Sequence, residues 1–270
     1  MNHLRQSLPA LRSRLRARFY SAGALLCALF TGACGTGGSI GQSPEALLLA
    51  NLPASGGSLT ANQLLGPATT SGTTVYGQFG DFTSNAGNSD GAGGGGVVSA
   101  NSISGPHGVT TDSAGNTYIV DTNNNRVLYY PAGSTTATRV YGQFGSFTSN
   151  AGNNNGSGGG GVISADSLSG PGAVAVDASD NVYIADMNNN RVLYYPAGST
   201  TATRVYGQGG SFSTAAANQG GLSDESLSRP RGVAVDSAGN LYIADLNNNR
   251  VLYFAAGSTT ATRVYGQFGS

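Results

Sequence analysis

The segment GPGAVAVDASDNVYIADMNNNRVLYYPAGSTTATRVYGQ, residues 170–208, occurs twice more in closely similar form, at residues 105–143 and 229–267. Its ending, VYGQ, occurs a fourth time at residues 75–78. The connectors between the units are rich in Gly, Asn and Ser, and only the connectors differ in length. A unit of constant length joined by variable connectors is typical of a structural repeat whose copies stack on one another.

Each unit is predicted to form four short antiparallel strands joined by tight turns. In the second unit, Val174-Ala175-Val176 and the apolar run 182–185 flank a polar segment, which is typical of a β-hairpin. Gly115 and Gly239 supply a positive φ in this turn in two units, and Asp180 takes their place in the other. The strands expected in the second unit are residues 174–176, 182–185, 191–195 and 203–206.

Two turns of every unit carry a repeated aspartate, and these aspartates are predicted to be structural because Asp side chains bond the backbone of tight turns. They are Asp112, Asp177 and Asp236 at the first turn, and Asp121, Asp186 and Asp245 at the second. The spacing D-x-N-x-N from Asp121 resembles the start of a calcium loop, but Arg126 stands where that loop needs Gly. No metal site is therefore predicted at these turns.

Repeated sheets of four antiparallel strands are typical of β-propeller blades. The first strand of each unit is built from Val, Ala and Gly, as expected where several strands crowd a central axis, and the outer strands carry the tyrosines. All 13 basic residues are Arg, and the chain is rich in Gly, Asn, Thr and Val. This composition disfavours a mainly helical protein, so the predicted class is all-β.

The same residues carry a family resemblance. The pattern P-x-G-V-A-V-D-x-x-G-N-x-Y-I-A-D-x-x-N-N-R-V, which starts at Pro230, resembles the NHL repeat, and copies in register start at Pro106 and Pro171. The resemblance implies a β-propeller, usually of about six blades. It places one repeat in each of residues 106–143, 171–208 and 230–267.

The number of repeats does not match a closed ring, because known propellers have about four to eight blades. Residues 57–105 are predicted to be a degenerate repeat and a Gly-rich connector, with one vestigial strand around residues 74–76. The sequence leaves two interpretations open. The three blades are part of a longer protein, or they form an arc that a second copy completes as a homodimer with about six blades.

Residues 1–33 are predicted to be a signal peptide, because five Arg precede a short apolar stretch at residues 21–33. Cys34 follows small residues and begins a flexible, Gly-rich tether over residues 34–56. The stretch resembles a bacterial lipoprotein signal, although Thr31 stands where that family prefers Leu. The resemblance implies a lipid on Cys34 and export to the cell envelope as a membrane-anchored protein. Ordinary secretion and a mitochondrial transit peptide stay open.

Composition disfavours several classes of function. After the leader, eight Arg face thirteen acidic residues, so a nucleic-acid partner is not expected. Two Cys and two His leave little material for a zinc site, a disulfide framework or a catalytic triad, and no cofactor is predicted. The Gly-rich segment 91–96 lacks the following helix and acidic residue that a dinucleotide site needs, and is interpreted as a flexible connector.

The informative positions are those at which the units differ. After the repeat's proline stand His107, Gly172 and Arg231, and Arg229 replaces a glycine of the other two units. These positions lie at the entry of the innermost strand, beside the propeller mouth, where varied polar residues are typical of ligand recognition. His107, Arg229 and Arg231 are therefore candidate contacts for a protein or carbohydrate ligand, with an ordinary solvent-facing loop as the alternative.

We expect a non-enzymatic binding or scaffold module tethered to the membrane by lipid. In the peptidyl-amidoglycolate lyases, similar propellers hold zinc with several histidines, whereas His107 is the one candidate here. A lyase or lactonase would need residues from further blades. A purely structural envelope protein is the other alternative.

Overall fold

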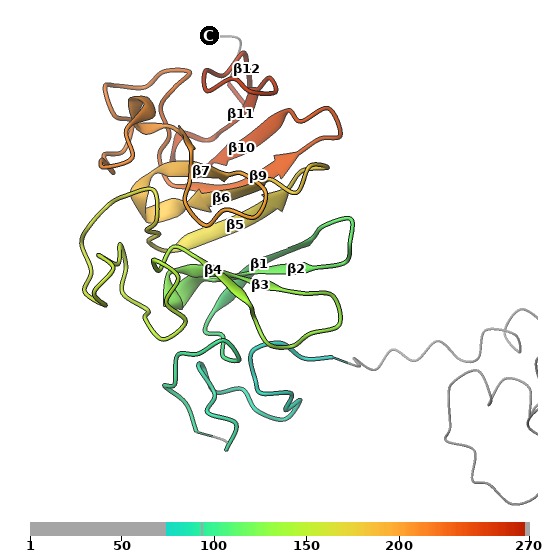
Figure 1. The fold of residues 1–270 in the computed structure, drawn as a ribbon. Helices are drawn as coiled ribbons and strands as arrows, with labels where there is room; N and C mark the ends of the chain where they lie inside the picture. The colour runs from blue at the N-terminus through green and yellow to red at the C-terminus, as the bar shows by residue number, and fades with distance from the viewer. Residues whose placement is uncertain (1–73, 93, 268–270) are drawn as a thin grey trace, which may run out of the picture. The chain divides into compact units, whose positions relative to one another are not determined.

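The computed structural model describes residues 74–92 and 94–267. The predicted signal peptide, Cys34 and the tether lie outside the described residues. Figure 1 shows three sheets that follow one another, in green, yellow and orange-red. Each is a four-stranded antiparallel sheet formed by one sequence unit, with its strands in chain order. Within the described part of the chain, no helix has the length and apolar character needed to cross a membrane.

The three sheets, called blades 1 to 3 below, have equivalent strands. Blade 1 comprises β1 (Pro106–Thr111), β2 (Thr117–Asp121), β3 (Arg126–Tyr130) and β4 (Arg139–Tyr141). Blade 2 comprises β5 (Pro171–Val176), β6 (Val182–Asp186), β7 (Arg191–Tyr195) and β8 (Arg204–Tyr206). Blade 3 comprises β9 (Pro230–Val235), β10 (Leu241–Asp245), β11 (Arg250–Phe254) and β12 (Arg263–Tyr265). The described residues also contain four short 3-10 turns: η1 (Thr122–Asn124), η2 (Met187–Asn189), η3 (Gln208–Gly210) and η4 (Leu246–Asn248). The predicted class and the four strands per unit are confirmed.

The first turn of each blade is held by its aspartate. Asp177 Oδ1 accepts hydrogen bonds from the backbone N–H groups of Ser179 (2.9 Å) and Asn181 (3.0 Å). Asp180 adopts the left-handed region with φ of 61°, where Gly115 and Gly239 of the other blades each have a φ of 81°. Asp tolerates this region better than most residues, which explains the exchange.

The inner strands β1, β5 and β9 pack side by side, and small residues make this possible. A Cβ atom on Gly108 of β1 would lie 3.3 Å from the Cα atom of Ala173 in β5. Behind these strands, the sheets bury their apolar faces against each other. Val120 and Val127 of blade 1 share one core with Ile184 and Leu193 of blade 2. The stack of blades is thus stabilised by the burial of apolar side chains between sheets.

Aromatic pairs connect the outer strand of one blade to the third strand of the next. The ring centroids of Tyr141 and Tyr195 lie 5.1 Å apart, and those of Tyr206 and Phe254 lie 5.2 Å apart. Such edge-to-face pairs contribute about 0.5–1.5 kcal/mol beyond their area burial. The interface between blades 1 and 2 and the interface between blades 2 and 3 thus use equivalent residues.

The vestigial strand predicted around residues 74–76 is not a strand in the structure. Tyr76 nevertheless packs on Tyr130 with centroids 4.9 Å apart, as an outer-strand tyrosine of a preceding blade would. Gln78 forms an isolated bridge with Ser102, as Gln143 does with Ser167. The side-chain contacts of the repeat are thus present, but no third strand lies beside Tyr76 in the described residues to pair with its backbone.

Candidate functional site

The residues that differ between blades lie at the starts of three adjacent inner strands. A Cβ atom on Gly172 would lie 3.2 Å from the carbonyl oxygen of Arg231. Gly172 is buried, whereas His107 and Arg231 on the flanking strands β1 and β9 are exposed. Gly172, on the central strand β5, has no side chain, so the exposed side chains of His107 and Arg231 belong to the two flanking strands.

Arg229 adopts a strained backbone conformation, with φ of 56°, just before β9. The equivalent Gly105 and Gly170 have φ values of 60° and 52°. Left-handed geometry costs a residue with a Cβ atom about 1–2 kcal/mol. Blade 3 thus carries a charged side chain where the other two blades avoid this strain.

In blade 3, where Arg229 replaces the glycine, an asparagine side chain also lacks the hydrogen bond that its equivalent makes in blade 1. In blade 1, Asn123 Nδ2 donates to Ser104 Oγ (3.2 Å), and a Cβ atom on Gly105 would lie 2.6 Å from that nitrogen. In blade 3, Asn247 keeps the backbone bond to Ser228, but its side chain makes no hydrogen bond within the described residues. The backbone N–H of Arg229 donates to Asn190 Oδ1 (2.7 Å), as that of Gly170 does to Asn125 Oδ1 (2.7 Å), so the scaffold fixes this backbone conformation. The arginine side chain is not needed for that bond, which makes Arg229 a candidate functional residue.

The charges of Arg229 and Arg231 are not neutralised by the fold. Within residues 74–92 and 94–267, the ion pairs are Asp121–Arg126, Asp186–Arg191 and Asp245–Arg250. Both of these arginines are exposed. Their guanidinium groups therefore present hydrogen-bond donors to solvent, which suits recognition of a carboxylate, sulfate or phosphate group.

The second-turn aspartates have a different role from the predicted bonds to their own turn. Asp186 makes no side-chain cap to η2. Its Oδ2 atom lies 2.7 Å from Arg191 Nε, and both side chains are fully buried. Its Oδ1 atom accepts a hydrogen bond of 2.8 Å from the backbone N–H of Ser169 in the connector. The turn-capping interpretation is corrected here: the carboxylate is the centre of a buried ionic cluster.

The buried arginine joins two connectors. Arg191 Nη1 donates to the carbonyl of Phe212 in the following connector (2.6 Å), and Nη2 donates to those of Ser164 and Ser167 in the preceding one, both at 2.9 Å. Burial raises the pKa of the Asp186 carboxyl, and the Arg191 guanidinium opposes that shift. The Asp–Arg pair and its bonds to the preceding connector occur in all three blades, so they belong to the scaffold.

The sequence did not reveal how the connectors are fixed. The side-chain amides of Asn153 and Asn189 exchange hydrogen bonds of 3.0 and 2.7 Å, which ties the connector before blade 2 to η2. Equivalent pairs join Asn88 to Asn124 and Asn218 to Asn248. The repetition of these asparagines was the available signal, and the interpretation as flexible connectors missed it.

Comparison with known proteins agrees with this architecture. The fold and its repeated turn chemistry define an all-β protein built from propeller-type blades. The family model described as NHL repeat matches residues 227–254, which contain β9, β10 and β11. The matched segment is thus similar to one NHL repeat, and blades 1 and 2 have the same four-stranded architecture as the blade that contains it. No curated protein matches the sequence.

Several solved structures are similar to this chain. Kuenenia stuttgartiensis hydrazine synthase has a TM-score of 0.41 and 13% identity, over 60% of this chain and 36% of that chain. A streptogramin B lyase has a TM-score of 0.37 and 15% identity, over 60% and 40%. The selenomethionine form of virginiamycin B lyase from Staphylococcus aureus has a TM-score of 0.34 and 12% identity, over 61% and 42%. The chain thus spans less than half of the length of each of these proteins.

Proposed function

We propose that this protein is a non-enzymatic binding module of the cell envelope, with a ligand site at the starts of β1, β5 and β9. The observation that carries the proposal is Arg229, a strained and exposed residue that stands where the other blades have glycine. Arg231 adds a second guanidinium that has no ion pair among the described residues, and His107 completes the exposed polar set. The ligand is an anionic group on a protein or carbohydrate, because planar guanidinium groups match such anions in geometry and charge.

Binding measurements on two glycine variants test this site. Arg229→Gly and Arg231→Gly reproduce the residues of blade 2, and each should weaken binding of acidic oligosaccharides or acidic peptides at least tenfold in calorimetry. Arg229→Gly should leave the free energy of unfolding unchanged or raise it by up to about 1 kcal/mol, because glycine relieves the strain.

The control is Arg139→Gln, which removes a guanidinium that lies 4.5 Å from the Tyr129 ring centroid on blade 1. It should bind like the unmodified protein. If the unmodified protein binds neither panel of anionic probes, or if the double glycine variant binds as tightly as the unmodified protein, the anionic site is refuted.

The proposed place of action depends on Cys34, which lies outside the described residues. A lipid on this cysteine would hold the blades at the membrane through the Gly-rich tether. Cys34→Ser should move the protein from the membrane fraction to the soluble fraction of its bacterial host, as measured by immunoblotting. Identical distribution of the two forms would contradict lipid anchoring and leave the mouth site unaffected.

A further inference from the structure

The connector between blades 1 and 2 contains the single Asn-Gly pair of the chain, Asn155-Gly156. Asparagine is a chemically labile residue. It is most labile before glycine, because no side chain hinders the approach of the following backbone nitrogen to the amide carbon. Both residues are exposed, although a described blade lies on each side of their connector. The pair is therefore accessible to water in the folded chain.

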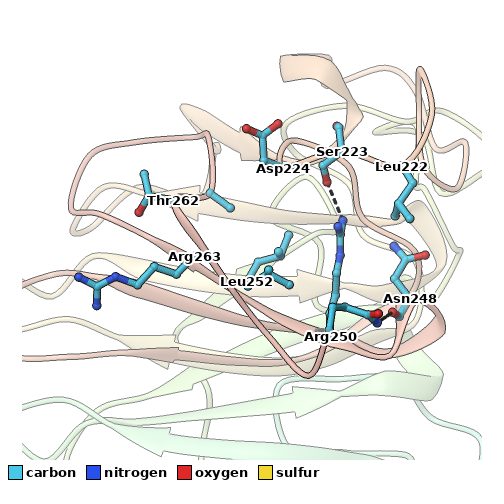
Figure 2. A pocket seen from close by; sticks show the side chains of 11 residues that line it. Leu222, Ser223, Asp224, Asn248, Arg250, Leu252, Thr262 and Arg263 are labelled. Atoms are coloured by element: carbon cyan, nitrogen blue, oxygen red, sulfur yellow. Dashed lines mark hydrogen bonds between the residues drawn. The ribbon is translucent and has the colours of Figure 1, made fainter. Parts of the chain in front are cut away.

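The ends of the connectors are held by buried arginines, and the Asn-Gly pair lies away from these ends. Arg191 Nη2 donates to the carbonyl of Ser164 near the end of the connector that contains the pair (2.9 Å). Figure 2 shows the equivalent bond of the next connector, from Arg250 to the carbonyl of Ser223 (2.7 Å). A reaction at residues 155–156 can therefore proceed without breaking the bonds that attach the connector to the blades.

The turn around the pair activates the side-chain amide of Asn155. Its Oδ1 atom accepts hydrogen bonds from the backbone N–H groups of Ser157 (2.9 Å) and Gly159 (3.2 Å). When a nucleophile attacks Cγ, negative charge develops on Oδ1, and two backbone donors stabilise that charge. The nearest nucleophile is the backbone nitrogen of Gly156, the next residue of the chain. The turn thus assists attack on the amide by its own backbone.

One hydrogen bond restrains this attack. The backbone N–H of Gly156 donates to Asn154 Oδ1 (2.9 Å), and the buried Asn154 is itself bonded to Gln143 Oε1 through Nδ2 (2.9 Å). The bond keeps the proton on the attacking nitrogen, so it has to open before the reaction. In the connector before blade 1, Ser89 takes this place, and its Oγ atom lies farther from the N–H of Gly91 (3.2 Å). Asn154 is therefore in a position to limit the rate.

The fold already accommodates the acid that the reaction would produce. In the connector before blade 1, Asp90 stands at the place of Asn155 and is also followed by glycine. Its Oδ1 atom accepts bonds from the backbone N–H groups of Ala92 (2.8 Å) and Gly94 (2.9 Å). These are the two donors that Asn155 uses in the other connector. An aspartate at residue 155 would therefore keep both bonds.

We propose that Asn155 is a self-modification site, at which the chain converts an amide into an acid without an enzyme. The backbone nitrogen of Gly156 bonds to Cγ of Asn155, and its proton passes through water to Nδ2. The bond from Cγ to Nδ2 breaks, ammonia leaves, and a cyclic imide (succinimide) forms. Water then opens the ring. Cleavage of the new bond to Cγ gives aspartate, and cleavage of the main-chain bond gives isoaspartate.

Each conversion adds one negative charge to the connector between blades 1 and 2. Newly made and aged molecules would therefore differ in charge, and the share of the acid form would record the age of the protein. The reaction needs water and no other reactant. It does not depend on the ligand proposed at the starts of β1, β5 and β9.

Incubation of the full chain tests the proposal. The chain has no Lys, so trypsin cuts only after Arg and releases residues 140–191 as one peptide. Mass spectrometry with fragmentation should show the change from amide to acid at Asn155 at least tenfold faster than at any other asparagine of this peptide. Both aspartate and isoaspartate should form, and the rate should rise with pH because the deprotonated nitrogen attacks.

Two variants provide the controls. Asn155→Gln should form no acid over the same time, because its side chain has to close a larger ring. Asn154→Ser reproduces the connector before blade 1 and should raise the rate at Asn155 severalfold, while the other asparagines of the peptide keep their rates. Conversion at Asn155 no faster than at its neighbours, or aspartate without isoaspartate, would overturn the proposal. An unchanged rate in Asn154→Ser would refute the restraint by Asn154.

Discussion

Asp186→Ala is expected to lower the free energy of unfolding by about 3–5 kcal/mol, because it leaves a buried arginine without its carboxylate. Both Asp186 and Arg191 are fully buried, and the carboxylate also accepts a bond of 2.7 Å from Asn189 Nδ2. Removing the carboxylate therefore leaves a charge and two hydrogen-bond donors uncompensated in the interior. Urea unfolding, followed by the circular dichroism of the sheets, measures the loss.

Two matched variants separate this explanation from simple loss of a turn cap. Asp177→Ala removes the aspartate of the first turn and should cost about 0.5–2 kcal/mol, the range for a lost cap. Asp245→Ala should cost less than Asp186→Ala, because the side chain of its partner Arg250 is 9% exposed and can reach water. Equal losses for Asp177→Ala and Asp186→Ala would contradict the role of burial.

Gly142→Ala is expected to lower the free energy of unfolding by about 2–4 kcal/mol, through backbone strain and overpacking. Gly142 has a φ of 96°, and a Cβ atom there would lie 2.6 Å from Cγ of Leu168. Leu168 is fully buried, so it has little room to move. Thermal unfolding followed by tyrosine absorbance measures the effect.

Gly145→Ala is the control for strain alone. Gly145 has a φ of 79°, but no atom lies within 4 Å of the position of its Cβ atom. This variant should therefore cost only about 1–2 kcal/mol. If both variants lost the same stability, the contact between Gly142 and Leu168 would not matter.

The parts of the fold that sequence reasoning predicted are those determined by neighbouring residues. The strand β6 (Val182–Asp186) differs from its expected range by one residue, because apolar runs and Asn- or Gly-containing turns act locally. Comparison of equivalent positions in the three units also identified Arg229 and Arg231, because these positions differ between otherwise similar units.

The parts that escaped prediction depend on residues far apart in the chain. Arg191 bonds carbonyl groups 21 residues after it and 27 residues before it, and no local pattern indicates such contacts. The segment 74–76 has the sequence of a strand, but pairing needs a partner strand that its own sequence does not provide. The strain at Arg229 likewise became visible only through its φ value and the lost bond of Asn247.

The buried arginines also determine where the repeat can change in length during evolution. Arg126 and Arg191 bond the connector carbonyls at the same offsets, 21 residues ahead and 27 behind, and Arg250 repeats the latter offset although its connector is shorter. Both ends of each connector are therefore fixed in register to an adjoining blade. We therefore expect insertions and deletions to be tolerated best in the middle, around residues 155–161, where a foreign peptide could be grafted without breaking these bonds.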